Sequence, residues 1–327
     1  MKDNKATGFL TGIFPVVPTP LKHDESLDLI GLSRCLTFYL DSPAAGVTVL
    51  GSGGELPYLS DAEQLSVVKQ AYQCVNKAKP IIVGVNAFSV HHALDKIAAY
   101  QGMADAVMVL FTGYYKHDFA ALKKAIKAVA ESSPVPVLYY HFPQVSGLFL
   151  NAPQLIEILS DTGVVGMKDS ALHVKSAKMV LQHCNDSAYF SGLSLLLPEL
   201  MNQGAVGAIC PIGAIAPTLT TEFFVNWVKG DKQAAQHTHS QLTHILPIVN
   251  NLAMSPVLQY RLLRWVTGFP ISLLKQASSP QAASKTALVL LGVDITSTVR
   301  RPLPALKDQS NEQILQCLKN AQLITRT

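Results

Sequence analysis

Lys168 ends a short apolar segment and is followed directly by Asp169 and Ser170. A short apolar run bounded by polar residues is typical of a buried strand, so the lysine is predicted at a strand's carboxyl end with its stem in apolar surroundings. Desolvation disfavours an ammonium group, and the resulting neutral amine is a nucleophile that can form a Schiff base with a carbonyl compound. From this segment alone, it is equally possible that the lysine has no catalytic role and that its ammonium group reaches water beyond a buried stem.

Hydroxyl groups and a glycine-rich turn follow other apolar segments. Tyr140 ends one segment, Ser52 and Gly53 lie in the turn after another, and Tyr115 follows a third. A hydrogen-bonded tyrosine can pass protons to and from a carbinolamine, and the N–H groups of a glycine-rich turn can hold a small carboxylate. These segment ends contain neither clustered His, Asp and Glu nor a Ser-His-acid set. We therefore expect imine chemistry on a carbonyl substrate, without cofactor or metal.

The elements that must position these residues follow from the apolar pattern. Eight apolar segments alternate with segments of helical period, at residues 13–17, 47–50, 81–85, 106–110, 135–140, 164–167, 189–190 and 206–210. Strands that alternate with helices indicate an α/β protein with a parallel sheet, and nearly continuous apolar runs indicate strands covered on both faces. The pattern favours a closed (β/α)8 TIM barrel, in which chemistry lies at the carboxyl ends of the strands. An open doubly wound sheet would usually carry a glycine-rich phosphate turn after its first strand, where this chain has a proline-rich segment.

The chain divides where the strands stop. Residues 1–217 are predicted to form the barrel core, and residues 218–327 its closing helices and a C-terminal helical domain. Ser60 and Glu63 have the spacing of a capping box that opens a helix. Glu55 is expected to form an internal ion pair or to accept an N–H group. Three histidines on a later helix are expected to be solvated: His237, His239 and His244.

The composition excludes several classes of protein. The 327 residues are 49% hydrophobic and 15% charged, which allows a large core and a buried subunit interface. A net charge of +4 without a basic run interleaved with aromatics argues against nucleic acid as a partner. The sequence contains no stretch of 18 apolar residues, so no membrane span is predicted. Five scattered cysteines and an N-terminal stretch without an apolar core lead us to expect a cytoplasmic protein.

Three motifs at these spacings resemble the dihydrodipicolinate synthase/N-acetylneuraminate lyase family. They read GSGGELPYLS at 51–60, LYYHFPQVSG at 138–147 and VVGMKDS at 164–170, and LLGVD with VRRPLPAL near the C-terminus looks like the family's last helices. The resemblance covers roughly residues 12–323. It implies a (β/α)8 barrel with a C-terminal helical extension, assembled as a homo-oligomer, either a tetramer or a dimer. It also implies a class I aldolase, in which pyruvate or another 2-keto acid forms an imine with a lysine.

The same resemblance implies catalytic roles for residues that match the motifs. Lys168 matches the Schiff-base lysine and Tyr140 the tyrosine of the family's Y-N-x-P motif. Ser52 matches the first hydroxyl residue of G-T-T-G-E, which takes part in a proton relay. Tyr115 looks like the tyrosine that completes this relay, in some members from a neighbouring subunit, although Tyr114 could take its place.

Other matches imply substrate binding. Gly53 stands where a second threonine usually helps to hold the pyruvate carboxylate, so we expect binding by the N–H groups of Ser52 and Gly53 and by the Ser52 hydroxyl. Ile209 resembles the residue that packs over the keto acid. Ser170 and Gly192 end two further predicted strands and are expected to line the site. His141 replaces the asparagine of the motif and is assigned no catalysis.

Departures from the family pattern bear on the second substrate. Val145 stands where dihydrodipicolinate synthases carry a carboxylate-binding arginine, and residues 192–195 lack the acidic groups of sialic acid lyases. The motif sequences look most similar to those of the 4-hydroxy-2-oxoglutarate aldolase-like and 2-keto-3-deoxy-sugar-acid aldolase branches of the family. We therefore predict retro-aldol cleavage of a 4-hydroxy-2-oxo acid to pyruvate and an aldehyde. Four apolar residues hint at a less polar aldehyde half: Leu193, Leu195, Val145 and Phe142.

Three alternatives stay open. The first is condensation of pyruvate with an aldehyde, as in dihydrodipicolinate synthase. The second is a non-catalytic relative that binds a keto acid, which the changes at Gly53 and His141 would favour. The third is a metal-dependent barrel lyase.

Overall fold

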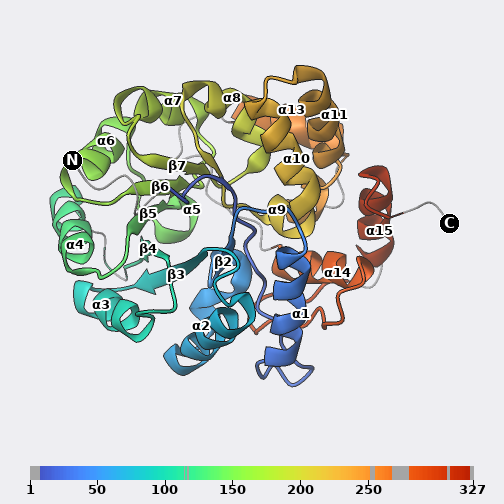
Figure 1. Ribbon diagram of the computed structural model, residues 1–327, viewed down its shortest axis with the longest axis horizontal. Helices are drawn as coiled ribbons and strands as arrows, with labels where there is room; N and C mark the ends of the chain where they lie inside the picture. The colour runs from blue at the N-terminus through green and yellow to red at the C-terminus, as the bar shows by residue number, and fades with distance from the viewer. Residues whose placement is uncertain are drawn as a thin grey trace.

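A closed barrel of parallel strands forms the centre of the protein. The computed structural model describes residues 8–113, 115, 118–250, 255–266, 280–307 and 310–324. Within them, eight parallel strands form one sheet: β1 (Gly12–Ile13), β2 (Val47–Val49), β3 (Ile81–Ala87), β4 (Ala106–Phe111), β5 (Val137–His141), β6 (Gly166–Asp169), β7 (Ala188–Ser191) and β8 (Gly207–Ala208). The order is β1-β8-β7-β6-β5-β4-β3-β2, and a parallel bridge between Val16 and Thr48 closes the sheet. The predicted barrel is confirmed (Figure 1).

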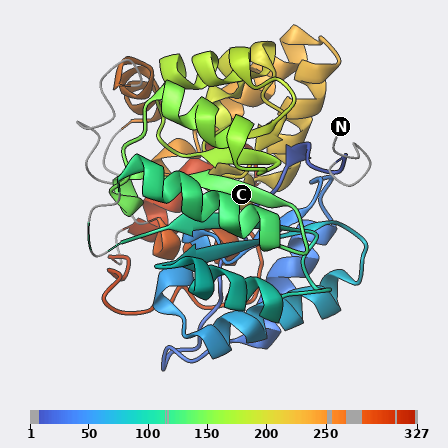
Figure 2. The same cartoon turned by 90° about the vertical axis from the view of Figure 1, so that its left-hand side faces the viewer.

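Helices surround this sheet, as the view from the side also shows (Figure 2). They are α1 (Leu29–Leu40), α2 (Asp61–Val75), α3 (Val90–Ala99), α4 (Phe119–Ser132), α6 (Ala152–Asp161), α7 (Val174–His183), α8 (Leu197–Leu200) and α10 (Pro217–Val228). The predicted capping box opens α2, because Ser60 Oγ accepts from the Glu63 N–H and the Glu63 carboxylate accepts from the Ser60 N–H. Among the described residues, no helix is both long enough and apolar enough to cross a membrane.

Shorter elements and the C-terminal helices complete the fold. Four short elements follow strand ends: η1 (Ser52–Gly54), η2 (Leu56–Tyr58), α5 (Pro143–Ser146) and α9 (Pro211–Ile215). The C-terminal helices are α11 (Lys232–Thr243), α12 (Leu246–Val249), α13 (Pro256–Val266), α14 (Gln281–Leu290) and α15 (Ser310–Asn320). Figure 1 shows α14 on the same side of the barrel as α1 and α9. An ion pair of 2.8 Å between Arg34 of α1 and Asp294 connects these regions.

One expectation about the C-terminal helices is wrong. His237 of α11 is exposed, as expected, but His244, directly after α11, is half-buried, and so is His239. Its ring lies 5.4 Å from the rings of both Phe223 and Tyr260, and its Nε2 hydrogen bonds with the Leu195 carbonyl. The apolar faces of the neighbouring helices α10 and α13 therefore remove His239 from water.

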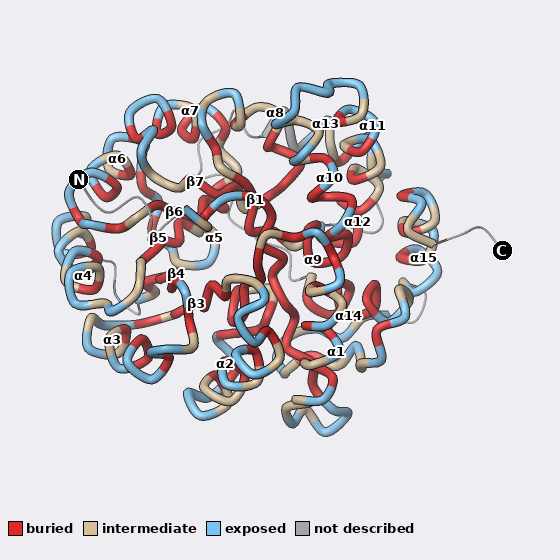
Figure 3. The backbone as a smooth tube through the Cα atoms, in the orientation of Figure 1, coloured by how far each residue is buried: buried red, intermediate tan, exposed pale blue. Residues whose placement is uncertain are grey.

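The core has two layers separated by the sheet, seen as the buried centre of Figure 3. Residues two apart in a strand share a face, so alternate side chains point into the barrel or toward the helices. Tyr140, Phe190 and Ile209 belong to the cluster inside the barrel. Tyr139 and Met167 belong to the larger cluster between sheet and helices. This alternation decides which polar residues reach the barrel mouth.

Candidate active site

Lys168, Tyr140 and Ser52 lie together at the carboxyl ends of the strands. Lys168 Nζ donates to the Tyr140 hydroxyl at 3.1 Å and lies 4.2 Å from the centre of its ring. The Tyr140 hydroxyl is 3.3 Å from Ser52 Oγ. With the amine as donor, the phenol can donate to Ser52, so the three groups form a continuous path for a proton. Lys168 and Tyr140 are only 3% and 4% exposed, which keeps this path in a dry environment.

Strand register brings the lysine and the tyrosine to one level. Tyr140 of β5 pairs with Lys168 of β6, which pairs in turn with Phe190 of β7. All three residues share the inward parity, so Phe190 and Tyr140 provide apolar walls around the lysine stem. Phe142, two residues beyond Tyr140, stacks on its ring with centroids 5.6 Å apart. The sequence prediction that Lys168 ends a strand inside the barrel is consistent with these positions.

Ser52 and Gly53 lie in the single turn η1 after β2. A helical turn leaves its first N–H groups without helical partners, which is the arrangement that carboxylate binding requires. A Cβ added at Gly53 would lie 3.2 Å from Val16 Cγ1, so a side chain here would need Val16 to shift. The turn ends at Glu55, whose φ of 61° is in the left-handed region. Such a conformation in a non-glycine residue requires support from neighbouring structure.

That support comes from the C-terminal region. Gln281 Nε2 of α14 donates to the Ser52 carbonyl at 3.0 Å. Lys285 Nζ, one helical turn later, lies 2.5 Å from Glu55 Oε1, and both side chains are fully buried. The other Glu55 oxygen accepts the Arg300 N–H at 2.8 Å. The expectation of an internal ion pair at Glu55 is confirmed, and three residues distant in sequence hold the turn that carries Ser52.

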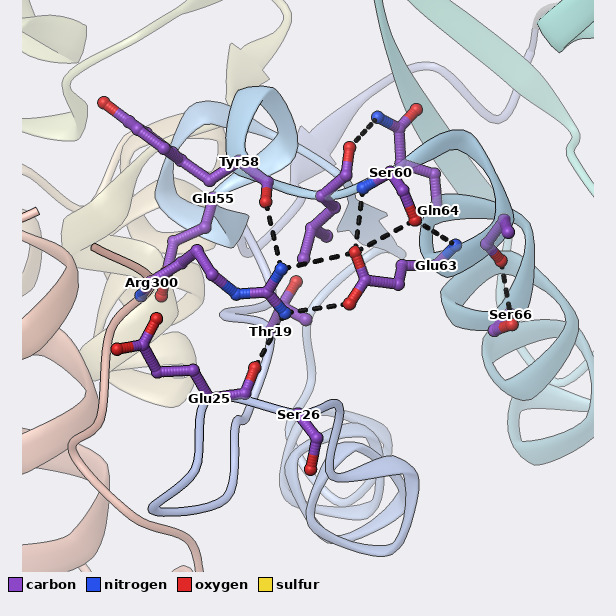
Figure 4. A network of polar contacts seen from close by, with 12 residues as sticks. Thr19, Glu25, Ser26, Glu55, Tyr58, Ser60, Glu63, Gln64, Ser66 and Arg300 are labelled. Atoms are coloured by element: carbon purple, nitrogen blue, oxygen red, sulfur yellow. Dashed lines mark hydrogen bonds and ion pairs between the residues drawn. The ribbon is translucent and has the colours of Figure 1, made fainter. Parts of the chain in front are cut away.

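Arg300 extends this support to the start of α2 (Figure 4). Its guanidinium donates to the Glu63 carboxylate, with distances of 2.8 and 3.3 Å, and to the carbonyls of Tyr58 and Glu25. Hydrogen bonds from Arg300, more than the opposing effect of burial, hold the pKa of Glu63 below its ordinary value. The segment from Ser52 to Glu63 is therefore fixed from the C-terminal side.

Three other predicted substrate-binding residues also line the inner face of the strand ends. Ile209 is fully buried in the inner cluster. Ser170 and Gly192 approach closely, because a Cβ added at Gly192 would lie 2.2 Å from Ser170 Oγ. Only glycine fits at this position. The Gly192 N–H donates to the Asp169 carbonyl at 2.7 Å, which holds the ends of β6 and β7 together.

Tyr115 is not buried with this set. It is 79% exposed and follows β4. Tyr114, the alternative from the sequence, lies outside the described residues, as do residues 116 and 117. Which tyrosine completes a relay stays a prediction.

His141 and Asp169 have the opposite parity and lie outside the barrel wall. His141 Nδ1 is 3.0 Å from Asp169 Oδ1, and the Tyr189 hydroxyl donates to Asp169 Oδ2 at 2.5 Å. Burial alone would raise the pKa of Asp169, but hydrogen bonds with His141 and Tyr189 outweigh it and keep that pKa below 3.8. An ionised carboxylate only accepts hydrogen bonds, so His141 carries its proton on Nδ1. These three buried, hydrogen-bonded side chains connect β5, β6 and β7 on the outer face of the sheet.

A cleft opens beside Tyr140 and Ser52, between the ends of β2 and β5. Its volume is about 20 Å³, and Val145 of α5 forms part of its wall. Leu193 and Leu195, predicted to border the aldehyde site, instead pack in the core between sheet and helices. They follow β7 on the outer side, which the sequence pattern alone did not distinguish. Among the described residues, no group of three or more His, Cys, Asp and Glu could hold a metal ion.

Known proteins resemble this chain over most of its length. The model of the dihydrodipicolinate synthetase family matches residues 9–267. A 4-hydroxy-tetrahydrodipicolinate synthase from Methanococcoides burtonii is 25% identical over 94% of this chain and 97% of its own. The Escherichia coli protein YagE, for which a 2-dehydro-3-deoxy-D-gluconate aldolase activity has been proposed, is 28% identical over 73% of this chain and 81% of its own.

Solved structures show the same fold. A chloride-inhibited dihydrodipicolinate synthase from Acinetobacter baumannii, complexed with pyruvate, superposes with a TM-score of 0.81 at 26% identity and covers 96% of this chain and 100% of that one. YagE in complex with pyruvate superposes with a TM-score of 0.82 at 23% identity, over 96% of this chain and 99% of its own.

Proposed function

Because the chain belongs to the dihydrodipicolinate synthetase family of carbon–carbon bond-forming and bond-cleaving enzymes, we propose that it is a pyruvate-releasing class I aldolase. In this proposal Lys168 forms an imine with a 4-hydroxy-2-oxo acid, which is cleaved to pyruvate and an aldehyde. The observation that carries the proposal is the 3.1 Å contact between a buried lysine amine and a buried phenol, with a hydroxyl next to it. An amine beside a proton donor is the minimum that imine formation requires.

The first step is attack of the neutral Lys168 amine on C2 of the keto acid. The carbonyl oxygen takes a proton from the Tyr140 hydroxyl, which is replenished through Ser52. Loss of water from the carbinolamine then gives a protonated imine between Nζ and C2. The nitrogen's positive charge makes C2 an electron sink for the next step.

Cleavage uses the same phenol in the opposite direction. Tyr140 first returns its proton through Ser52 and, as the phenolate, accepts the proton of the C4 hydroxyl. The C3–C4 bond then breaks, and the electron pair of that bond moves to the imine to form an enamine. The aldehyde leaves, C3 takes a proton, and water hydrolyses the imine to free pyruvate and Lys168. The reaction needs no added oxidant or metal, so we propose that no cofactor takes part.

Several residues would hold the pyruvate half. The N–H groups of Ser52 and Gly53 would bind its carboxylate, and Ile209, Ser170 and Gly192 would enclose it. The resemblance to the family leads us to include a homo-oligomer, dimer or tetramer, in the proposal. The five cysteines are free, which suits a cytoplasmic enzyme.

Condensation of pyruvate with an aldehyde is the second candidate, and the named synthases among the relatives favour it. Val145 argues against the lysine-biosynthetic substrate, because it lines the cleft with no cation for a carboxylate.

A panel of 4-hydroxy-2-oxo acids tests the proposal. Pyruvate release, coupled to lactate dehydrogenase, should be detected with at least one member and should be lost in Lys168→Met. No release from any member, charged, hydroxylated or apolar, would contradict aldolase function.

A further inference from the structure

The turn η1 is built from residues that allow two orientations of its central peptide. The Gly54 N–H donates to the Gly51 carbonyl at 2.9 Å, which is the hydrogen bond of a β-turn with Ser52 and Gly53 at its centre. Type I and type II turns both keep this bond, and they differ by a rotation of the central peptide of about 180°. Type II requires a positive φ at the third residue, which glycine adopts without steric cost. The sequence of the turn alone therefore leaves the orientation of the Ser52–Gly53 peptide open.

The structure contains the type I orientation, because η1 has the geometry of a 3₁₀ helix. A trans peptide is planar, so its C=O and N–H bonds point in opposite directions. The Ser52 carbonyl is directed at α14, where it accepts from Gln281 Nε2 at 3.0 Å. The Gly53 N–H, which belongs to the same peptide, therefore points away from that helix. In a type II turn the carbonyl oxygen and this N–H would exchange directions.

Two donors hold the Ser52 carbonyl in this direction. The Glu55 N–H reaches it from within the turn at 3.2 Å, which is at the long end of the range for such bonds. The shorter bond comes from Gln281, which is only 9% exposed, so that water competes little for the carbonyl. Lys285, one helical turn along α14, forms the buried ion pair with Glu55 and fixes the helix against the turn. Gln281 is thus an external clamp on one particular peptide.

Val16 explains why the turn needs such a clamp. A Cβ added at Gly51 would lie 2.6 Å from Val16 Cγ1, and one added at Gly53 would lie 3.2 Å from it. Side chains at these two positions would therefore require Val16 to shift. Glycine at position 53 fits beside Val16, but it also permits the positive φ that a rotated peptide needs.

We infer that Gln281 is a positioning residue that keeps the Gly53 N–H directed at the carboxylate of the keto acid. In the rotated peptide the Ser52 carbonyl oxygen would face that carboxylate, and the two negatively polarised groups would repel each other. The C-terminal helix α14 thereby contributes to the affinity for the keto acid without touching it. This inference rests on the proposed aldolase function and deepens its account of how the keto acid is bound.

Gln281→Met tests the inference with pyruvate as the only ligand. Methionine keeps the length of the side chain but has no donor for the Ser52 carbonyl. The rate of imine trapping by cyanoborohydride is measured against pyruvate concentration on the full chain. The half-saturating concentration should rise about three- to tenfold, as for the loss of one hydrogen bond. The maximal rate should change less than about twofold, because the correctly oriented fraction of the enzyme reacts as before.

Acetone distinguishes this role from a general disturbance of Lys168. It forms an imine with an amine as pyruvate does, but it has no carboxylate for the Gly53 N–H to bind. Its trapping rate in Gln281→Met should stay within about twofold of the wild-type rate. Equal losses with acetone and pyruvate would mean that Gln281 only maintains structure.

Thr286→Val is the matched control on the same helix. Thr286 is 6% exposed, and its hydroxyl donates to the Ala282 carbonyl at 2.9 Å, so the variant removes a buried hydrogen bond within α14. The half-saturating pyruvate concentration should stay at the wild-type value. A rise equal to that in Gln281→Met would assign the effect to a loosened α14 and overturn the inference.

A second background tests the rotation of the peptide. In Val16→Ala/Gly53→Ala the smaller residue 16 leaves room for a Cβ at position 53, and that Cβ disfavours a positive φ. Adding Gln281→Met to this background should raise the half-saturating concentration less than about twofold, because the peptide is now held by its own side chain. An undiminished rise would mean that Gln281 does not act through the orientation of the peptide.

The outcomes separate this inference from the function on which it rests. If the wild-type protein traps pyruvate and Gln281→Met does so with the same half-saturating concentration, the inference is wrong and the aldolase stands. If the wild-type protein does not trap pyruvate, both fall together.

Discussion

Replacing Lys285 with methionine would leave the Glu55 carboxylate buried without its cation. Both side chains have no exposed surface, and Nζ lies 2.5 Å from Oε1 and 2.6 Å from the Thr298 carbonyl. Burial lowers the pKa of Lys285, and the Glu55 carboxylate opposes that shift. Removing one partner of a buried ion pair costs about 3–5 kcal/mol. At roughly 2 °C per kcal/mol for a chain of this size, the melting temperature should fall by about 6–10 °C.

The effect should extend to the active site. Glu55 ends the turn that carries Ser52, and Gln281, on the same helix as Lys285, holds the Ser52 carbonyl. Calorimetry with pyruvate-release assays, both on the full chain, would therefore show a lower melting temperature together with a lower kcat. The double variant Glu55→Gln/Lys285→Met should recover much of the stability, because it leaves no buried charge unpaired.

Lys178→Met is the matched control. Lys178 pairs with Glu199 at 3.5 Å on the surface, with 40% of its side chain exposed, and such pairs contribute at most about 1 kcal/mol. If Lys285→Met changed stability no more than Lys178→Met, the buried pair would not be holding the turn.

Three further predictions concern the site and its surroundings. Tyr140→Phe should fold normally and lower kcat about 10²- to 10⁴-fold, as expected for loss of the proton donor, and near-wild-type turnover would refute that role. Asp169 has a lowered pKa in the folded state, so its carboxylate stabilises the protein above about pH 4 and ceases to do so as the pH falls through that folded-state pKa. Urea unfolding of Asp169→Asn should therefore show a deficit near neutral pH that shrinks in acid, and a pH-independent deficit would contradict this. Turnover should be unchanged after treatment with EDTA, whereas a loss restored by a divalent cation would indicate a metal-dependent lyase.

Much of the architecture was predictable because the strands are covered on both faces. Each strand appears in the sequence as a compact apolar run, and the residue that ends it can be read off directly, as with Lys168 after Met167. The side chains of Lys168 and Tyr140 also point to the same face of neighbouring strands, so they come together in any barrel with this strand order. Strand bounds were less accurate: β1 is Gly12–Ile13 rather than a segment reaching residue 17, because among the following residues only Val16 pairs with a neighbouring strand, through an isolated bridge to Thr48.

Residues outside the strand ends were harder to find. The contact between Gln281 and Ser52 joins positions 229 residues apart, and no local pattern marks Lys285 as a buried cation. Leu193 was misplaced because the side of the wall on which a loop residue packs depends on how the loop turns after β7.

Covalent trapping of pyruvate is the most direct test of the account. The wild-type protein, incubated with pyruvate and reduced with borohydride, should carry one reduced pyruvate unit on the peptide that contains Lys168, and Lys168→Met should carry none. Unmodified wild-type protein, or modification spread over surface lysines and retained in Lys168→Met, would show that this amine is not the nucleophile.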